Sequence, residues 1–128
     1  MLTATPLYAG FLTLLFLLLS ANVVRGRYLH RVSVGDGGDK DLMKRMRAQA
    51  NFVEYAPLGL LLIAFCEMQG LALWAVHALG LMLLLGRCLH AYGFGSTPQI
   101  VPLRRIGMVL TITALLFAAL ANIVLSLI

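Results

Sequence analysis

Residues 47–57 read RAQANFVEYAP and place an arginine, an asparagine and a glutamate where a membrane span should be apolar. Read as a helix, Arg47, Asn51 and Glu54 fall at positions i, i+4 and i+7 and share one face. An ionisable group at membrane depth costs roughly 2.5–3.5 kcal/mol on insertion scales, so it is normally kept only where it pairs inside a bundle or holds a polar ligand. This face is therefore the first candidate for a site.

The composition is that of a membrane protein. Of the 128 residues, 61% are hydrophobic and 12% are charged, and the mean hydropathy is +0.93, which is far too apolar for an ordinary soluble domain. Residues 1–24, 68–86 and 106–128 carry no charge. Each stretch reaches the roughly 20 residues that a helix needs to cross about 30 Å of hydrocarbon. The fourth apolar stretch, residues 55–66, can cross only if the segment from Arg47 to Glu54 is drawn in with it.

These stretches predict an all-α integral membrane protein in which residues 1–128 form a single bundle of four transmembrane helices. The expected helices span about residues 2–27, 40–67, 71–92 and 103–127. Asp39 follows a glycine-rich loop and is expected to cap the second helix. Gly93 opens the segment that is expected to end the third helix, and Pro102 is expected in the first turn of the fourth.

The positive charges predict the orientation of the bundle. All ten lysines and arginines lie either within residues 25–47 or at Arg87, Arg104 and Arg105. The connection around residues 67–70 has none, and neither terminus has any. Because cytoplasmic loops are enriched in Lys and Arg, both basic regions are predicted to be cytoplasmic and both termini to lie on the other side.

Further polar residues gather at the same cytoplasmic mouth. Arg87 and His90 are three residues apart near the end of the third helix, so they share a face. Arg104 and Arg105 open the fourth helix, where the helix dipole favours anions, and Arg25 leaves the first helix at the same membrane face. Taken singly, each arginine is explained as an anchor for lipid headgroups.

The carboxylate and amide of the second helix are different, because an anchor needs neither group. We therefore interpret Glu54, with Arg47 and Asn51, as part of a functional site. The alternative is a polar clamp between helices that only holds the bundle together.

The segment Arg47–Pro57 is similar to the Arg-x-x-x-Asn-x-x-Glu-Tyr-x-Pro signature in helix two of the membrane-associated proteins in eicosanoid and glutathione metabolism, the MAPEG superfamily. This superfamily contains microsomal glutathione transferases, leukotriene-C synthase and microsomal prostaglandin E synthase. Residues 87–90 resemble the family's Arg-x-x-His at the end of helix three, and residues 102–104 resemble the Pro-x-Arg that opens helix four. The resemblance covers essentially the whole chain and is strongest to the small bacterial members.

This resemblance implies a homotrimer of four-helix subunits in a bacterial inner membrane. Glutathione is the implied co-substrate, bound between neighbouring subunits near the cytoplasmic face, and a lipophilic electrophile arrives from the bilayer. The implied catalytic residue is Arg104, which stabilises the glutathione thiolate. The implied glutathione-binding residues are Arg25, Arg47, Gln49, Asn51, Glu54, Tyr55, Arg87, His90 and Arg105. Neither a metal nor a nucleic-acid partner is expected.

The residue types fit this ligand independently of the resemblance. Glutathione carries two carboxylates and one amino group, so its site needs several arginines and an acid. Its thiol, with a pKa of about 8.5, is only a few per cent thiolate at neutral pH. An arginine at a helix N-terminus supplies the positive potential that favours the anion.

One departure from the family and two alternatives stay open. Several catalytic relatives carry a tyrosine seven residues after the helix-three arginine, where this chain has Phe94. The activity can be transfer or peroxide reduction, and the family also includes a non-catalytic ligand-binding scaffold. A small four-helix multidrug exporter has a similar length, but its essential carboxylate is expected in the first helix, which here has no acid.

Overall fold

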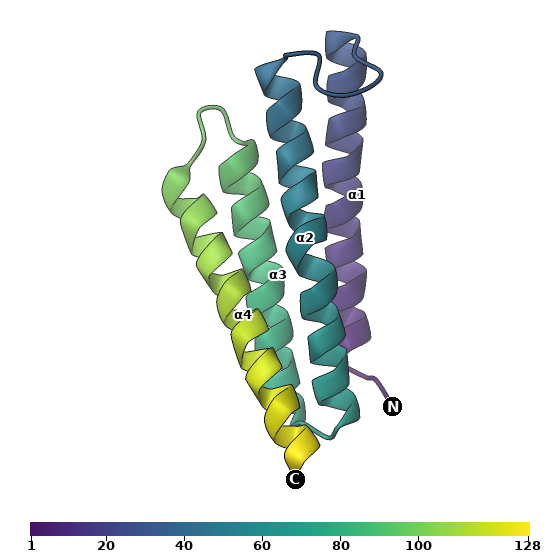
Figure 1. The fold of residues 1–128 in the computed structure, drawn as a ribbon, viewed down its shortest axis with the longest axis vertical. Coiled ribbons are helices and arrows are strands. Elements are labelled where there is room, and N and C mark those ends of the chain that lie inside the picture. Colours follow the sequence, from purple (N-terminus) through teal and green to yellow (C-terminus); the bar gives the residue numbers. More distant parts are fainter.

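Four long helices make up the computed structural model, which describes all 128 residues. They are α1 (Thr5–His30), α2 (Lys40–Met68), α3 (Leu73–Gly95) and α4 (Val101–Leu127). The helices run alternately up and down, so the loops 31–39 and 96–100 lie at one end and both termini lie at the other (Figure 1). There are no strands, and all four helices are long and apolar enough to cross a membrane. The prediction of an all-α chain with four membrane-length helices is confirmed.

The helices α2 and α3 occupy the centre of the bundle. Each of them contacts all three other helices, whereas α1 and α4 do not touch. The buried core between them includes Leu12, Phe52, Ile63, Leu83 and Ala114. Residues on α2 and α3 are consequently best placed to meet side chains from the rest of the bundle.

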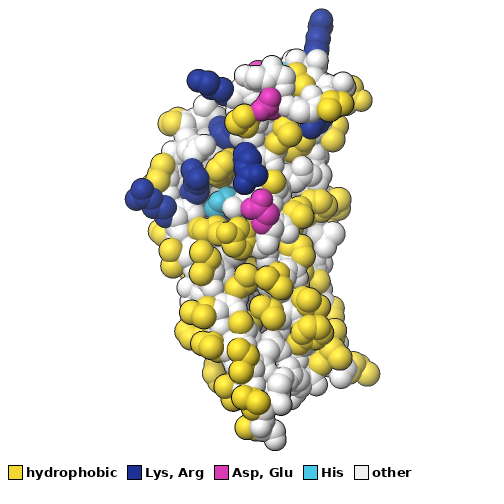
Figure 2. All heavy atoms as spheres, viewed as in Figure 1, with side chains coloured by type: hydrophobic (Ala, Val, Ile, Leu, Met, Phe, Trp, Pro, Cys, Tyr) yellow, Lys and Arg dark blue, Asp and Glu magenta, His cyan; other side chains and the backbone are white.

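The outside of the bundle is apolar over most of its length. Large exposed side chains include Leu14, Leu18, Phe117 and Ile123. Figure 2 shows hydrophobic side chains over the lower part of the visible face and Lys and Arg side chains gathered near the end that carries the two longer loops. Exposed apolar surface on this scale marks contact with a membrane or a partner rather than with water.

Carboxylates hold the starts of two helices. Asp39 accepts a hydrogen bond from the backbone N–H of Leu42 at 2.8 Å, so the predicted N-cap of α2 is present. At the opposite end, Glu67 accepts backbone N–H bonds from Thr3 at 2.6 Å, and from Ala4 and Thr5 at 2.8 Å each. These donors have no partner inside α1, and an anion there also complements the helix dipole. The carboxylate at the end of α2 thus explains why α1 begins at Thr5 and not near residue 2.

Two helix ends extend beyond the expected positions. Helix α1 continues to His30, three residues past the expected end, and it ends at Arg31, whose left-handed backbone lets its N–H donate to the Arg27 carbonyl. Helix α3 runs to Gly95 and contains Gly93, which was expected to end it. A Cβ at Gly93 would lie 2.6 Å from the backbone nitrogen of Arg104. This glycine therefore allows the start of α4 to approach α3, and does not act as a helix stop.

Candidate functional site

The arginine and glutamate of the helix-two motif meet on the outer surface of α2. The Nη2 atom of Arg47 lies 3.6 Å from Oε1 of Glu54, and the side chains are 56% and 52% exposed. The two residues are seven apart, so the helix repeat brings them together as the sequence predicted. In a single chain this ion pair faces outward rather than into the bundle.

Arg87 is the most deeply buried charged residue, with 1% of its surface exposed. Its Nη1 atom donates to the side-chain oxygen of Asn51 at 2.7 Å and to the Asn51 backbone oxygen at 3.2 Å. Its Nη2 atom lies 3.8 Å from the sulfur of Met108, and its Nε has no partner in the chain. The guanidinium carbon is 5.7 Å from the centre of the Tyr55 ring. Arg87 thus joins α3 to the helix-two motif and to α4.

Arg104 is held at the start of α4 by two neighbours. Its guanidinium carbon lies 4.6 Å from the centre of the Phe94 ring, within the range of a cation–π interaction. Its Nη1 atom donates to Oε1 of Gln99 at 3.1 Å. The same Phe94 ring stacks on the imidazole of His90, with 5.6 Å between the ring centres. The arginine side chain is therefore exposed to the cleft but fixed in direction.

A cleft of about 380 Å³ lies between these elements. Its walls come from α2, α3 and α4, and it is lined by Asn51, His90, Val101, Arg104, Arg105 and Met108. Two arginines and an amide face it, and no carboxylate lines it. The cleft therefore offers hydrogen-bond donors and positive charge, which suits a ligand that carries carboxylate or carbonyl oxygens.

Other predicted site residues lie away from this cleft within one chain. Gln49 turns towards α1, where its Nε2 atom donates to Ser20 at 2.9 Å. Arg25 is exposed on α1 and makes no hydrogen bond, and α1 does not touch α4. Arg47 and Glu54 do not line the cleft either. The ten predicted residues are consequently gathered at one end of the bundle but on separate faces of it.

Sequence reasoning missed the contact roles of Phe94, Gln99 and Met108. Met108 is four residues after Arg104, so the helix repeat gave a signal that it shares a face with that arginine. Phe94 was noted only for lacking a hydroxyl, because nothing in the sequence shows which ring will lie against the guanidinium. Lys44 was also missed: its Nζ atom donates to the Ser96 carbonyl at 3.0 Å and to the Thr97 hydroxyl at 2.9 Å. It ties the loop before α4 to α2.

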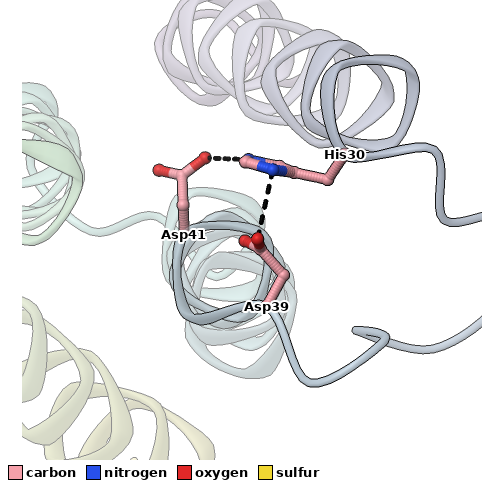
Figure 3. Close-up of side chains that lie close together, drawn as sticks. All are labelled: His30, Asp39 and Asp41. Atoms are coloured by element: carbon pink, nitrogen blue, oxygen red, sulfur yellow. Dashed lines mark hydrogen bonds and ion pairs between the residues drawn. The ribbon is translucent and has the colours of Figure 1, made fainter.

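A second polar cluster joins the end of α1 to the start of α2 (Figure 3). Nδ1 of His30 lies 3.1 Å from Asp39, and Nε2 lies 2.8 Å from Asp41. The imidazole stands between the carboxylates, and each ring nitrogen faces a different one. Asp41 also accepts a bond from Arg45 at 2.9 Å. The arrangement fits a clamp between two helices better than three ligands that converge on one ion.

Comparisons with known proteins identify the family of the chain. The model of the MAPEG family matches residues 5–124. The chain is 44% identical over 119 residues to the inner membrane protein YecN of Escherichia coli K12, an alignment that covers 93% of this chain and 89% of the relative. The YecN sequence of the O6:H1 strain of the same species gives the same identity and coverage. With four membrane-length helices and a family match over nearly its whole length, the chain belongs to the MAPEG family.

Proposed function

We propose that the protein is a membrane glutathione transferase that activates glutathione as a thiolate for attack on lipophilic electrophiles. The observation that carries this proposal is the donor-lined cleft, in which Arg104 stands in the first turn of α4 against Phe94. Lowering the pKa of the glutathione thiol by about two units requires about 2.7 kcal/mol of preferential stabilisation of the thiolate. A fixed guanidinium at a helix N-terminus supplies stabilisation of this kind.

The direct test is a thiolate spectrum. Adding glutathione to the purified protein in detergent at neutral pH should produce the ultraviolet absorbance of a thiolate, and S-methylglutathione, which has no ionisable thiol, should not. Glutathione binding without this absorbance would contradict the transferase assignment.

That outcome would favour a second function, a non-catalytic membrane scaffold that binds ligands. The replacement of the family tyrosine by Phe94 is the observation that favours it, because the ring beside Arg104 has no hydroxyl. If the thiolate forms, parallel assays with a lipid hydroperoxide and with an apolar electrophile distinguish peroxide reduction from conjugation.

A homotrimer with sites shared between subunits is part of the proposal. The pair of Arg47 and Glu54 is about half exposed on the outside of one chain, at 56% and 52%. Because ionisable groups that face hydrocarbon cost roughly 2.5–3.5 kcal/mol each, the pair favours a neighbouring subunit as cover. Arg25 and Gln49 do not line the cleft of their own chain, so a contact between these residues and a ligand there requires the copies of a neighbouring subunit.

Glu54→Gln is expected to weaken glutathione binding by about tenfold, because the carboxylate that would hold the amino group of glutathione becomes neutral. Isothermal titration calorimetry measures the affinity, and native mass spectrometry in mild detergent measures the assembly. Glu67→Gln is the matched control, since Glu67 lies at the other end of α2 and caps α1. Monomers that bind glutathione as tightly as the wild type would contradict the shared site.

We place the protein in a bacterial inner membrane with both termini outside the cytoplasm. The likeness to the inner membrane protein YecN supports the location, and the gathering of basic residues around the loops 31–39 and 96–100 supports the orientation. Reporter fusions at Gly37 and Ser96 should report the cytoplasm, and a fusion at Gln69 should report the periplasm. The reverse pattern would move the cleft to the wrong side for cytoplasmic glutathione.

A further inference from the structure

The hydrogen bonds of Arg87 determine which way the Asn51 amide points. A guanidinium has only donors, so the amide atom that faces it must be the oxygen. The Nη1 atom of Arg87 contacts the Asn51 side-chain oxygen at 2.7 Å and the backbone oxygen at 3.2 Å. The other end of the amide, with its two N–H groups, is therefore the end that is left for a different partner.

That nitrogen has no hydrogen-bond partner in the chain, and Asn51 lines the cleft with Arg104 and Arg105. The two arginines also offer only donors. Arg87, by contrast, does not line the cleft and is 1% exposed. Its Nη1 and Nη2 groups are directed at Asn51 and Met108. The buried arginine is thus placed to act on a ligand through Asn51 rather than by touching it.

We propose that Arg87 is a positioning residue, which locks the Asn51 amide with its N–H donors towards the cleft so that they receive a carboxylate or carbonyl oxygen of the substrate. The inference rests on the proposed function and deepens it. It gives Arg87 an indirect role in place of the ligand contact implied by the family resemblance. It also assigns the cleft to an acceptor-bearing part of glutathione, because no carboxylate lines it to receive the amino group.

Asn51→Asp tests the direction of the amide. Aspartate has nearly the same shape and pairs with Arg87 at least as strongly, but the atom that faces the cleft changes from a donor to an acceptor. We expect glutathione affinity to fall about tenfold or more, while the unfolding temperature in detergent stays the same or rises. Asn51→Ala removes the donor without adding charge and should also weaken binding. An Asn51→Asp protein that binds glutathione like the wild type would overturn the proposal.

A double-mutant cycle tests whether Arg87 acts through Asn51. Arg87→Gln should weaken glutathione binding in the wild-type background, because the amide is no longer locked. The same change should have no further effect in the Asn51→Ala background. Equal losses in both backgrounds would show direct contact with the ligand and overturn the positioning role. If Arg87→Gln does not fold, the same cycle is run with Arg87→Lys, which keeps the positive charge but not the fixed fork of donors that holds the Asn51 oxygens.

The wild-type titration separates this inference from the proposed function. Calorimetry with glutathione on the wild-type protein must first show binding, and its absence would overturn both. Wild-type binding that is unchanged in Asn51→Asp would overturn only the inference and leave the transferase proposal standing.

Discussion

Arg104→Ala is expected to lower the rate of glutathione conjugation to a small apolar electrophile by about 10²–10³-fold, the usual effect of removing one fixed donor to a reacting anion. The reason is that Arg104 alone combines the first turn of α4 with a fixed direction, set by the Phe94 ring at 4.6 Å and by Gln99 at 3.1 Å. Glutathione affinity should change only a few-fold, since other donors remain in the cleft. Steady-state kinetics and calorimetry on the same preparation measure the two effects.

The pH dependence gives an independent readout. Without Arg104 the bound thiolate loses stabilisation, so the pKa of the bound thiol should rise towards its free value of about 8.5. The rate would then recover at alkaline pH, and the pH–rate profile should move upward. Arg105→Ala is the matched control, because Arg105 lines the same cleft but makes no hydrogen bond and stacks on no ring in the structure. A large effect at Arg105 alone would show that Arg105, and not Arg104, stabilises the thiolate.

Much of the fold was predictable because a bilayer leaves few solutions. Uncharged stretches of sufficient length predict three of the helices. The fourth, α2, is predicted once the polar segment from Arg47 to Glu54 is counted as part of it. The helix ends were less predictable, because they depend on contacts from elsewhere in the chain. The start of α1 is set by Glu67, which lies more than 60 residues away, and Gly93 serves the approach of α4 rather than a turn.

The candidate site was predictable where its residues lie on one helix. Spacing alone placed Arg47 beside Glu54, and the same argument would have placed Met108 beside Arg104. It could not show that Gln49 turns to Ser20 on α1 while Asn51, two residues later, turns to Arg87 on α3. Which helix a face meets depends on the packing of the bundle, and α2 touches all three neighbours.

Gly107→Ala is expected to destabilise the bundle, although it adds only one carbon atom. Gly107 lies where α4 crosses α3, and an added Cβ would lie 2.5 Å from the Gly86 carbonyl oxygen and 2.8 Å from the His90 Cα. Both neighbours are backbone atoms, so the clash is relieved only if the helices move apart. Small residues at such crossings are what allow membrane helices to pack closely. Overpacking of this kind typically costs about 1–3 kcal/mol.

Thermal unfolding in detergent, followed by circular dichroism and by retention of glutathione binding, measures the effect. Gly10→Ala is the matched control, because it makes the same chemical change inside a helix where a Cβ meets nothing within 4 Å. It should leave the unfolding temperature unchanged or slightly raised, as alanine favours a helix over glycine by up to about 1 kcal/mol. Moving α4 from α3 also separates Arg104 from Phe94, so Gly107→Ala should lose conjugation activity even below its unfolding temperature. Equal unfolding temperatures for the two variants would show that the close crossing of α3 and α4 does not hold the site together.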